Sequence, residues 1–327
     1  MNLLILSAGT RNKVVQYFKQ ECAEGDRIIA TDCSNLAPAV YEADKFYLVP
    51  RINHPDYLNI ILDICKKEEI AGVLSLIDPE LSLIAKHRAQ FETIGTKVIV
   101  PDYELVETCF NKYDMYKLLC KLQIPTAKCY MQKEVFYEEK SQGKIAYPVF
   151  VKPVTGSASM HINKVSSDEE LNVLCSMYDD LMIQEFMDGQ EYGADVYIDM
   201  ITGKVSTIFV KEKIKMRAGE TDKSISVKDE QLFELIQRFV ETCGFKGIID
   251  IDIFKVNGVY YVSEVNPRFG GGYPHAYESG VNVPQLIMKN LRGEVTDPSI
   301  GAYRENICMM KYNEIMIKEI ARQDIVQ

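Results

Sequence analysis

The sequence predicts a mixed fold, with an α/β unit built on a parallel sheet at the N-terminus and an α+β part with antiparallel strands after it. Short apolar strands alternate with helices over roughly the first hundred residues, whereas strands dominate from Tyr147 onward. The chain has 327 residues, and at roughly 150 residues per domain this length indicates about two domains. The hydrophobic content of 47% is ample for a packed core.

The N-terminal unit is expected to be a half-size Rossmann-like unit. Strands are predicted at residues 3–6, 27–31, 72–77 and 97–100, and helices at 14–20, 57–67 and 80–91. This alternation is typical of a parallel sheet with crossover helices, whose ligands bind beyond the carboxyl ends of the strands. Those ends lie near residues 7–11, Asp32 and residues 78–80. A dinucleotide site is disfavoured, because residues 7–12 lack the three spaced glycines of a pyrophosphate turn.

The rest of the chain is expected to begin with a helical pair at residues 102–122, which Pro125 brings to an end. Antiparallel strands are predicted at 148–153, 181–186, 193–198 and 205–211, then a helix at 229–243 and strands at 247–256 and 259–265. Residues 311–324 have the pattern of a charged amphipathic helix. That helix is expected to pack either on the body of the protein or on a second subunit of a homodimer.

Charge and cysteine content exclude several classes of protein. The 37 Lys and Arg against 47 Asp and Glu give a net charge of −10, so neither nucleic acid nor an anionic membrane is an expected partner. Nine cysteines without a CxxC pair fit reduced core thiols, among them Cys22, Cys65, Cys120 and Cys175. The N-terminus does not resemble a signal peptide, and no apolar run is long enough to span a bilayer. The expected location is the cytoplasm.

The strongest group of polar residues lies late in the chain, around the hairpin signal Asn257-Gly258. Because side chains alternate along a strand, Glu264, Asn266 and Arg268 share one face of the second arm. On the first arm, Asp250 and Asp252 likewise share a face. Unpaired buried carboxylates are costly, and carboxylate and amide oxygens are ligands that suit Mg²⁺. A solvent-facing polar stripe on an edge hairpin is the alternative that this segment alone leaves open.

Earlier segments add further polar residues, although each one alone is typical of ordinary scaffold. Lys152 ends an apolar strand and is followed by Thr155-Gly156-Ser157-Ala158-Ser159, whose small residues let backbone N–H groups approach phosphate. Asn111-Lys112 opens a helix upstream. Gln184-Glu185-Phe186-Met187 and Gly189-Gln190-Glu191-Tyr192 follow downstream.

Taken in this order, the motifs resemble those of the ATP-grasp superfamily, and within it the carboxylate–amine ligases that are similar to the large subunit of carbamoyl phosphate synthase. The resemblance covers nearly the whole chain. It implies a Rossmann-like pre-ATP-grasp domain at residues 1–101, an ATP-grasp N-terminal lobe with a helical linker at 102–187, and a C-terminal lobe with the metal and substrate site at 188–327.

The resemblance also implies roles for individual residues. Lys112 and Lys152 would hold the α- and β-phosphates of ATP under the loop that contains Gly156, Ser157 and Ser159. The other implied roles are adenine binding by Glu185, Phe186 and Met187, ribose binding by Glu191, binding of one or two Mg²⁺ or Mn²⁺ ions by Asp252, Glu264 and Asn266, and contact with the γ-phosphate and acyl-phosphate by Arg268. The loop departs from the family pattern after Ser159, so a role for His161 stays open.

Substrate contacts are expected from two further regions. The segment of related ligases that is similar to residues 211–221 faces the reaction centre, which assigns Lys213 and Arg217 to it, the arginine as a clamp for a carboxylate. A solvated charged turn is the alternative for this basic stretch. The remaining expected substrate contacts are Arg11, Glu80, Gly271 and His275.

The implied activity is ADP-forming ligation. A substrate carboxylate attacks the γ-phosphate of ATP, and an amine then displaces phosphate from the acyl-phosphate. Small-molecule carboxylates and amines are the expected substrates, and their identity is not readable from the residues. Two alternatives stay open, namely an ATP-binding sensor or regulatory protein without turnover, and an enzyme that phosphorylates carbamate or another small acid without ligation.

Overall fold

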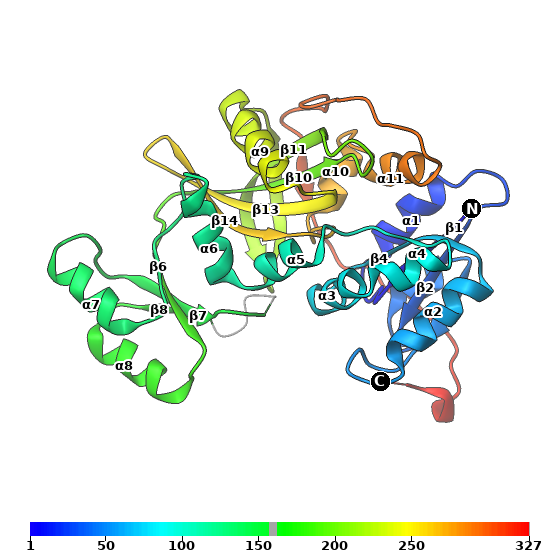
Figure 1. Cartoon of the computed structure of the whole chain (residues 1–327), viewed down its shortest axis with the longest axis horizontal. Helices are drawn as coiled ribbons and strands as arrows, with labels where there is room; N and C mark the ends of the chain where they lie inside the picture. Colours follow the sequence, from blue (N-terminus) through cyan, green and yellow to red (C-terminus); the bar gives the residue numbers. More distant parts are fainter. Residues whose placement is uncertain (157–161, 327) are drawn as a thin grey trace.

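The computed structural model describes residues 1–156 and 162–326, whose strands form three sheets (Figure 1). A five-stranded sheet lies at the N-terminal end of the molecule, and a four-stranded sheet with helices α7 (Lys133–Ser141) and α8 (Asp168–Met177) lies at the other. A six-stranded sheet occupies the middle. The predicted mixture of α/β and α+β architecture is confirmed.

The N-terminal sheet is parallel, as predicted, with the strand order β3-β2-β1-β4-β5. Its strands are β1 (Asn2–Leu6), β2 (Arg27–Asp32), β3 (Lys45–Leu48), β4 (Ile70–Ser75) and β5 (Lys97–Val98). Its helices are α1 (Asn12–Gln20), η1 (Pro38–Glu42), α2 (Tyr57–Lys67), α3 (Asp78–Lys86) and α4 (Arg88–Thr93). The carboxyl ends of β1, β2 and β4 therefore meet at one edge of the sheet, which faces the rest of the protein.

Two details of this unit differ from the sequence prediction. β3 was not expected, because none of its residues is fully buried and it carries no apolar run typical of a core strand. The single helix predicted at residues 80–91 is wrong. α3 ends and α4 begins at His87, whose backbone angles of φ −103 and ψ 17 are not helical.

The predicted helical pair is confirmed as α5 (Tyr103–Phe110) and α6 (Lys112–Lys121). Asn111 separates the two helices with an extended backbone, and its side chain accepts hydrogen bonds from the N–H groups of Tyr113 and Asp114. This N-cap explains why α6 begins at Lys112.

The four-stranded sheet has the order β6-β9-β7-β8 and is antiparallel. Its strands are β6 (Cys129–Tyr130), β7 (Val149–Pro153), β8 (Asn163–Val165) and β9 (Leu181–Glu185). Phe136 of α7 and Leu171 of α8 are fully buried in the apolar cluster against this sheet. The small lobe therefore has its own core.

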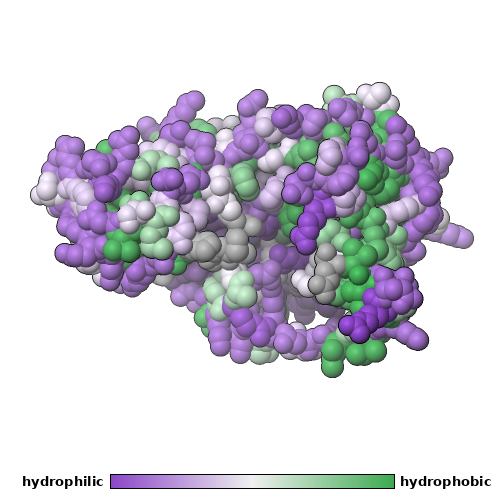
Figure 2. Space-filling model, turned by 90° about the horizontal axis from the view of Figure 1, so that it is seen from below, coloured by the Kyte–Doolittle hydropathy of each residue, from purple (hydrophilic) through white to green (hydrophobic). Residues whose placement is uncertain are grey.

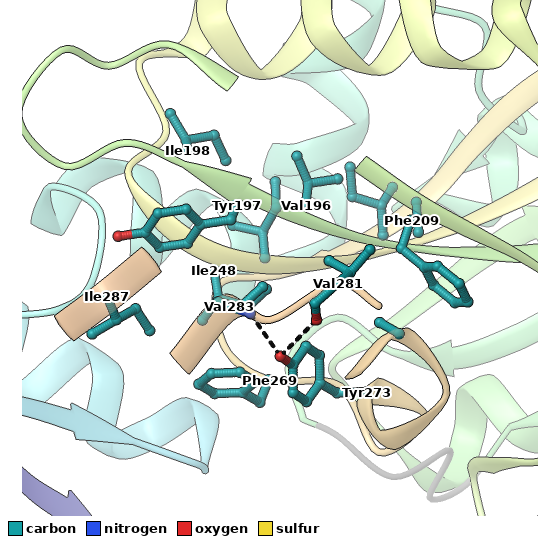
Figure 3. Packing of buried hydrophobic residues seen from close by; sticks show 14 of the residues in the cluster. Val196, Tyr197, Ile198, Phe209, Ile248, Phe269, Tyr273, Val281, Val283 and Ile287 are labelled. Carbon is teal, nitrogen blue, oxygen red and sulfur yellow. Dashed lines mark hydrogen bonds between the residues drawn. The ribbon is translucent and has the colours of Figure 1, made fainter. Parts of the chain in front are cut away.

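The six-stranded sheet has the order β14-β13-β10-β11-β12-β15. Its strands are β10 (Gln190–Ile198), β11 (Val205–Arg217), β12 (Glu220–Val227), β13 (Gly247–Val256), β14 (Val259–Asn266) and β15 (Cys308–Met310), and its helices are α9 (Glu230–Cys243), α10 (Tyr273–Glu278) and α11 (Val283–Leu291). Figure 3 shows the core beneath it, where Tyr273 packs beside Phe269. The Tyr273 hydroxyl donates to the Val281 carbonyl and accepts from the Val283 N–H, which ties the segment after β14 to α11 (Figure 3).

The helix predicted for residues 311–324 is wrong. The chain there forms no regular helix or strand, apart from the short turn η2 (Arg322–Asp324), and runs back to the N-terminal unit, where Asn35 binds the backbone of Asp324 and Val326. Ile315 is 91% exposed, so no apolar stripe is buried that would stabilise a helix.

All nine cysteines are free thiols, as expected, but Cys120 and Cys308 are exposed, so the prediction of core thiols is wrong for Cys120. No helix within the described residues is long and apolar enough to cross a membrane.

Candidate active site

The predicted polar hairpin is formed by β13 and β14, and its carboxylates face each other. In the antiparallel register Asp252 lies opposite Glu264, and Asp250 lies opposite Asn266. All four side chains line one cavity, together with Arg268 directly after β14. The alternative of a solvent-facing stripe on an edge hairpin does not fit this placement.

This cavity, of about 370 Å³, is lined by residues of all three parts of the chain. Residues 11 and 76–78 come from the N-terminal unit, Lys112 from α6, and Lys152 to Gly156 from the small lobe. Seen from below, the surface of the lobe that carries α7 and α8 is mostly hydrophilic, and the molecule is hollowed near its middle (Figure 2). The predicted site residues that the cavity brings together are Arg11, Lys112, Lys152, Gly156, Lys213, Asp252, Glu264, Asn266, Arg268 and Gly271.

The chemistry of the hairpin fits a divalent cation. Asp252 and Glu264 are like charges placed directly opposite each other, an arrangement that is destabilising without a shared cation. Within residues 1–156 and 162–326, the carboxylate of Glu264 makes no hydrogen bond or salt bridge. The described residues contain no group of three or more His, Cys, Asp or Glu suited to a metal. The oxygen atoms that could hold one at the hairpin are those of Asp252, Glu264 and the Asn266 amide. Mg²⁺ is commonly held by one or two carboxylates, with phosphate oxygens and water completing its shell.

Two lysines line the cavity. Lys152, next to the last residue of β7, is buried, and burial lowers its pKa although the carboxylate of Glu264 acts in the opposite direction. Lys112 at the start of α6 donates to the carbonyl of Gly156 at 2.5 Å. The positive charges thus gather where an anionic ligand would compensate them. The predicted contacts Ser157 and Ser159, like His161, lie outside the described residues.

Lys213 of the large sheet pairs with two carboxylates, one on β10 and one on β13. Its ammonium lies 2.5 Å from Asp252 Oδ1 and 2.7 Å from Glu191 Oε1. Burial disfavours the charged lysine, but these two carboxylates outweigh it and raise the pKa of Lys213. Residues 211–217, for which a solvated charged turn was the alternative, belong to strand β11, and Lys213 lies on the cavity face of that strand. Arg217 is 53% exposed, pairs with Asp222, and does not line the cavity.

Arg268 is held by a residue of the N-terminal unit. Its Nε lies 2.7 Å from Asp78 Oδ1 and its Nη2 lies 3.3 Å from Asp78 Oδ2, and Nη2 also donates to Asn266 Oδ1. Burial disfavours a charge at this place, but Asp78 outweighs it and raises the pKa of Arg268. The two-point contact fixes the plane of the guanidinium group beside the carboxylates of the hairpin.

The residues expected at adenine lie at the end of β9, outside the cavity lining. Glu185 is tied to Lys128, whose N–H donates to its carboxylate and whose carbonyl accepts from its N–H. The ammonium of Lys164 lies 4.0 Å from the ring centroid of Phe186. Adenine binding by Glu185, Phe186 and Met187, and ribose binding by Glu191, stay predictions.

The structure does not bring His275 or Glu80 to the cavity. His275 is buried, its Nδ1 lies 2.7 Å from Ser224 Oγ and its Nε2 2.8 Å from the Ile307 carbonyl. Burial lowers the pKa of His275 to about 4, which fits a neutral ring within the core. Glu80 is fully buried and accepts hydrogen bonds from Tyr57 and Ser75 at the edge of the parallel sheet. The hydrogen bonds of His275 and of Glu80 suit a structural role for each residue.

We expect Glu80 to make the protein less stable as the pH rises. Burial raises the pKa of its carboxyl group above the ordinary value, although hydrogen bonds to Ser75 and Tyr57 oppose the shift. The folded state therefore binds this proton more tightly, and stability is lost from about pH 4.3, the ordinary pKa of glutamate, upward. In urea unfolding between about pH 5 and 8, Glu80→Gln should gain stability over the wild type as the pH increases. A difference in stability between Glu80→Gln and the wild type that stays constant with pH would contradict the expectation.

The cavity also contains three carboxylates to which the sequence assigned no individual role: Asp78, Glu220 and Asp250. Asp78 follows β4 at the edge of the parallel sheet where a ligand was expected. Asp250 belongs to the predicted polar hairpin and shares its strand face with Asp252, and burial raises its pKa. Glu220 lies in the segment 211–221 that was expected to face the site, and it reaches the cavity through the β11–β12 hairpin.

Comparisons with known proteins agree with this architecture. Residues 3–99 match the family described as "PylC-like, N-terminal domain", and residues 109–272 match the family described as "ATP-grasp domain". Among solved structures, the biotin carboxylase domain of Hydrogenobacter thermophilus 2-oxoglutarate carboxylase, crystallised with MgADP and bicarbonate, is similar with a TM-score of 0.75 and 18% identity, over 94% of this chain and 73% of that one. The L-amino acid ligase of Bacillus licheniformis is similar with a TM-score of 0.67 and 18% identity, over 90% and 75%.

Among curated proteins, the arginine-specific large chain of carbamoyl phosphate synthase from Geobacillus stearothermophilus is 25% identical over 83% of this chain but only 26% of its own length. D-alanine–D-alanine ligase of Acetivibrio thermocellus is 26% identical over 54% of each chain. This chain therefore spans about a quarter to a half of these relatives. The predicted resemblance is confirmed, and because the ATP-grasp model matches half of the chain, the protein belongs to the ATP-grasp family.

Proposed function

We propose that the protein is an ATP-dependent, ADP-forming ligase that converts a substrate carboxylate to an acyl-phosphate and joins it to an amine. The observation that supports this most strongly is the convergence of Lys112, Lys152 and Arg268 with the oxygen ligands of the hairpin around one cavity. The relatives named D-alanine–D-alanine ligase and L-amino acid ligase support the same reaction class.

The nucleotide would bind between the small lobe and the large sheet. Lys112 and Lys152 would neutralise the α- and β-phosphates, with the backbone at Gly156 close to them. Adenine would contact residues 185–187 and the ribose hydroxyls Glu191. This placement matches the charge distribution, since Lys152 is a buried cation without a hydrogen-bonded or salt-bridged carboxylate among the described residues.

Asp252, Glu264 and Asn266 would hold one or two Mg²⁺ or Mn²⁺ ions. When bound, such an ion neutralises phosphate charge and orients the β- and γ-phosphates. Lys213 would hold the carboxylate of Asp252 in place through the 2.5 Å contact between its ammonium group and Oδ1. Of the two predicted catalytic residues on β11, Lys213 would therefore act by positioning Asp252. We assign no catalytic role to Arg217, because its side chain does not line the cavity.

In the first step an oxygen of the substrate carboxylate would attack the γ-phosphorus, and the bond from that phosphorus to the β-phosphate oxygen would break. ADP leaves with that oxygen, and the acyl-phosphate forms. Arg268 would stabilise the charge on the transferred phosphoryl group, in an orientation fixed by Asp78. In the second step the amine attacks the acyl carbon, phosphate leaves, and the amine loses a proton.

The experiment is ADP release measured with Mg²⁺ and pools of amino acids and small carboxylic acids. ADP release that depends on both an acid and an amine, and that consumes the amine, supports the ligase. ADP release without loss of amine would favour phosphorylation of a small acid. ATP binding without ADP release in any pool would contradict the proposal and favour a sensor. Lys152→Gln is the matched control, because it should reduce nucleotide binding and turnover together.

A further inference from the structure

Glu220, which lines the cavity together with Arg11, has its carboxylate between two cations. Its Oε1 lies 2.8 Å from Nη2 of Arg11, and its Oε2 lies 2.8 Å from Nζ of Lys311. The three residues come from distant parts of the chain, namely the loop after β1, the start of β12 and the segment after β15. Each carboxylate oxygen therefore has its own cationic partner.

The backbone of Gly271 lies directly against this group. A Cβ atom at Gly271 would lie 2.6 Å from Cδ of Glu220 and 2.8 Å from Nη1 of Arg11. A side chain at this position would therefore displace the ends of the Glu220 and Arg11 side chains. The backbone after β14 thus lies beside the charged group.

The carboxylate of Glu220 is also accessible and replaceable. Its side chain is 41% exposed, and within the described part of the chain Arg11 and Lys311 are its salt-bridge partners. It follows the hairpin tip Ala218-Gly219, where both residues have positive φ values. Rotation of the side chain would free both cations without moving a strand.

The group formed by Arg11, Lys311 and Glu220 carries a net positive charge. Burial opposes ionisation of Glu220, but Arg11 and Lys311 outweigh this effect and lower the pKa of Glu220, so its carboxyl group is ionised at neutral pH. Two cations and one carboxylate leave one net positive charge, and Arg268 adds to the attraction for an anion. A carboxylate of a ligand has the same shape and charge as that of Glu220.

We propose that Arg11 and Lys311 form a subsite for a substrate carboxylate other than the one that is phosphorylated, and that Glu220 occupies this subsite until the substrate binds. The inference rests on the proposed ligase function. The shared chemistry is a second carboxylate, which belongs either to an amino acid that serves as the amine or to a dicarboxylic acid that serves as the acid. Glu220 is then a specificity residue, because a ligand has to displace it.

The test compares carboxylate probes with their amides, in which an uncharged carboxamide replaces each carboxylate, in the wild type and in Glu220→Gln. Binding of glycine, glycinamide, succinate and succinamide is measured by calorimetry in the presence of MgADP. We expect at least one carboxylate probe to bind about tenfold more tightly to Glu220→Gln, while its amide is unchanged. A gain for glycine assigns the subsite to the amine substrate, and a gain for succinate assigns it to the acid. Adding Arg11→Gln to Glu220→Gln should remove the gain.

Matched measurements separate this inference from the function on which it rests. Glu314→Gln, an exposed change on the same C-terminal segment, should leave all affinities unchanged. Failure of the wild type to bind MgADP would count against the proposed function, and the probes are then compared without nucleotide. Unchanged or weaker carboxylate binding to a Glu220→Gln protein with the wild-type melting temperature would overturn the subsite. Weaker binding of both glycine and glycinamide would show that Glu220 binds an ammonium group instead.

Discussion

Arg268→Gln is expected to lower the rate of ADP release about 100- to 1,000-fold, the range for losing one fixed donor to a developing charge. The guanidinium lies among the hairpin carboxylates and is oriented by two contacts with Asp78. Because it would act on the γ-phosphate only as the phosphoryl group is transferred, the Kd for ADP should change little. Steady-state kinetics and calorimetry measure the two quantities.

The conservative variants make this prediction specific. Arg268→Lys keeps the charge but loses the planar fork, so we expect intermediate activity. Asp78→Asn keeps Arg268 and removes the charge that orients it, so the loss in kcat should be smaller than in Arg268→Gln. Equal loss of ADP affinity and of turnover in Arg268→Gln would show instead that the arginine contributes to the binding of ADP itself.

The largest effect on stability is expected for Lys211→Met. Lys211 forms a salt bridge with Asp195, and the two side chains are 1% and 0% exposed. Removing the lysine leaves a buried charge without compensation, a change that costs about 3–5 kcal/mol of unfolding free energy. Asp195 Oδ1 has no hydrogen-bond partner among the described residues, so Lys211 provides the hydrogen bond that compensates this carboxylate. Urea unfolding followed by circular dichroism measures the loss.

The double variant Lys211→Met/Asp195→Leu should recover most of this stability, because it removes both charges from the interior. Lys117→Met breaks an exposed pair with Asp114 on α6 and is the control, for which the unfolding midpoint should not move. A double variant as unstable as Lys211→Met would show that the packing of Lys211, and not the unpaired charge, is responsible.

The centre of the site was predictable from local sequence patterns. Asp252, Glu264, Asn266 and Arg268 share the cavity because the side-chain period of a strand and the Asn-Gly turn are properties of a short segment. The parallel sheet was predictable for the same reason, since each strand and helix of the N-terminal unit has its own pattern of apolar residues.

Contacts between distant segments were not predictable in this way. His275 follows the glycines after the hairpin, as a substrate contact would, but packing turns its ring into the core toward Ser224 and Ile307. Residues 311–324 have helical periodicity, yet they form no α-helix, and their backbone is bound at both ends to other parts of the chain. In both cases tertiary contacts decided between conformations that the local pattern allows.

The composition of the candidate site and the class of fold thus follow from residue patterns within single elements. The tertiary structure decided which charged groups meet: Arg268 with Asp78, 190 residues apart, and Glu220 with Arg11 and Lys311. The physical reason is that a period of two or 3.6 residues determines which way a side chain points within its element. Its partner across a cavity depends on how sheets and loops far apart in the chain pack together.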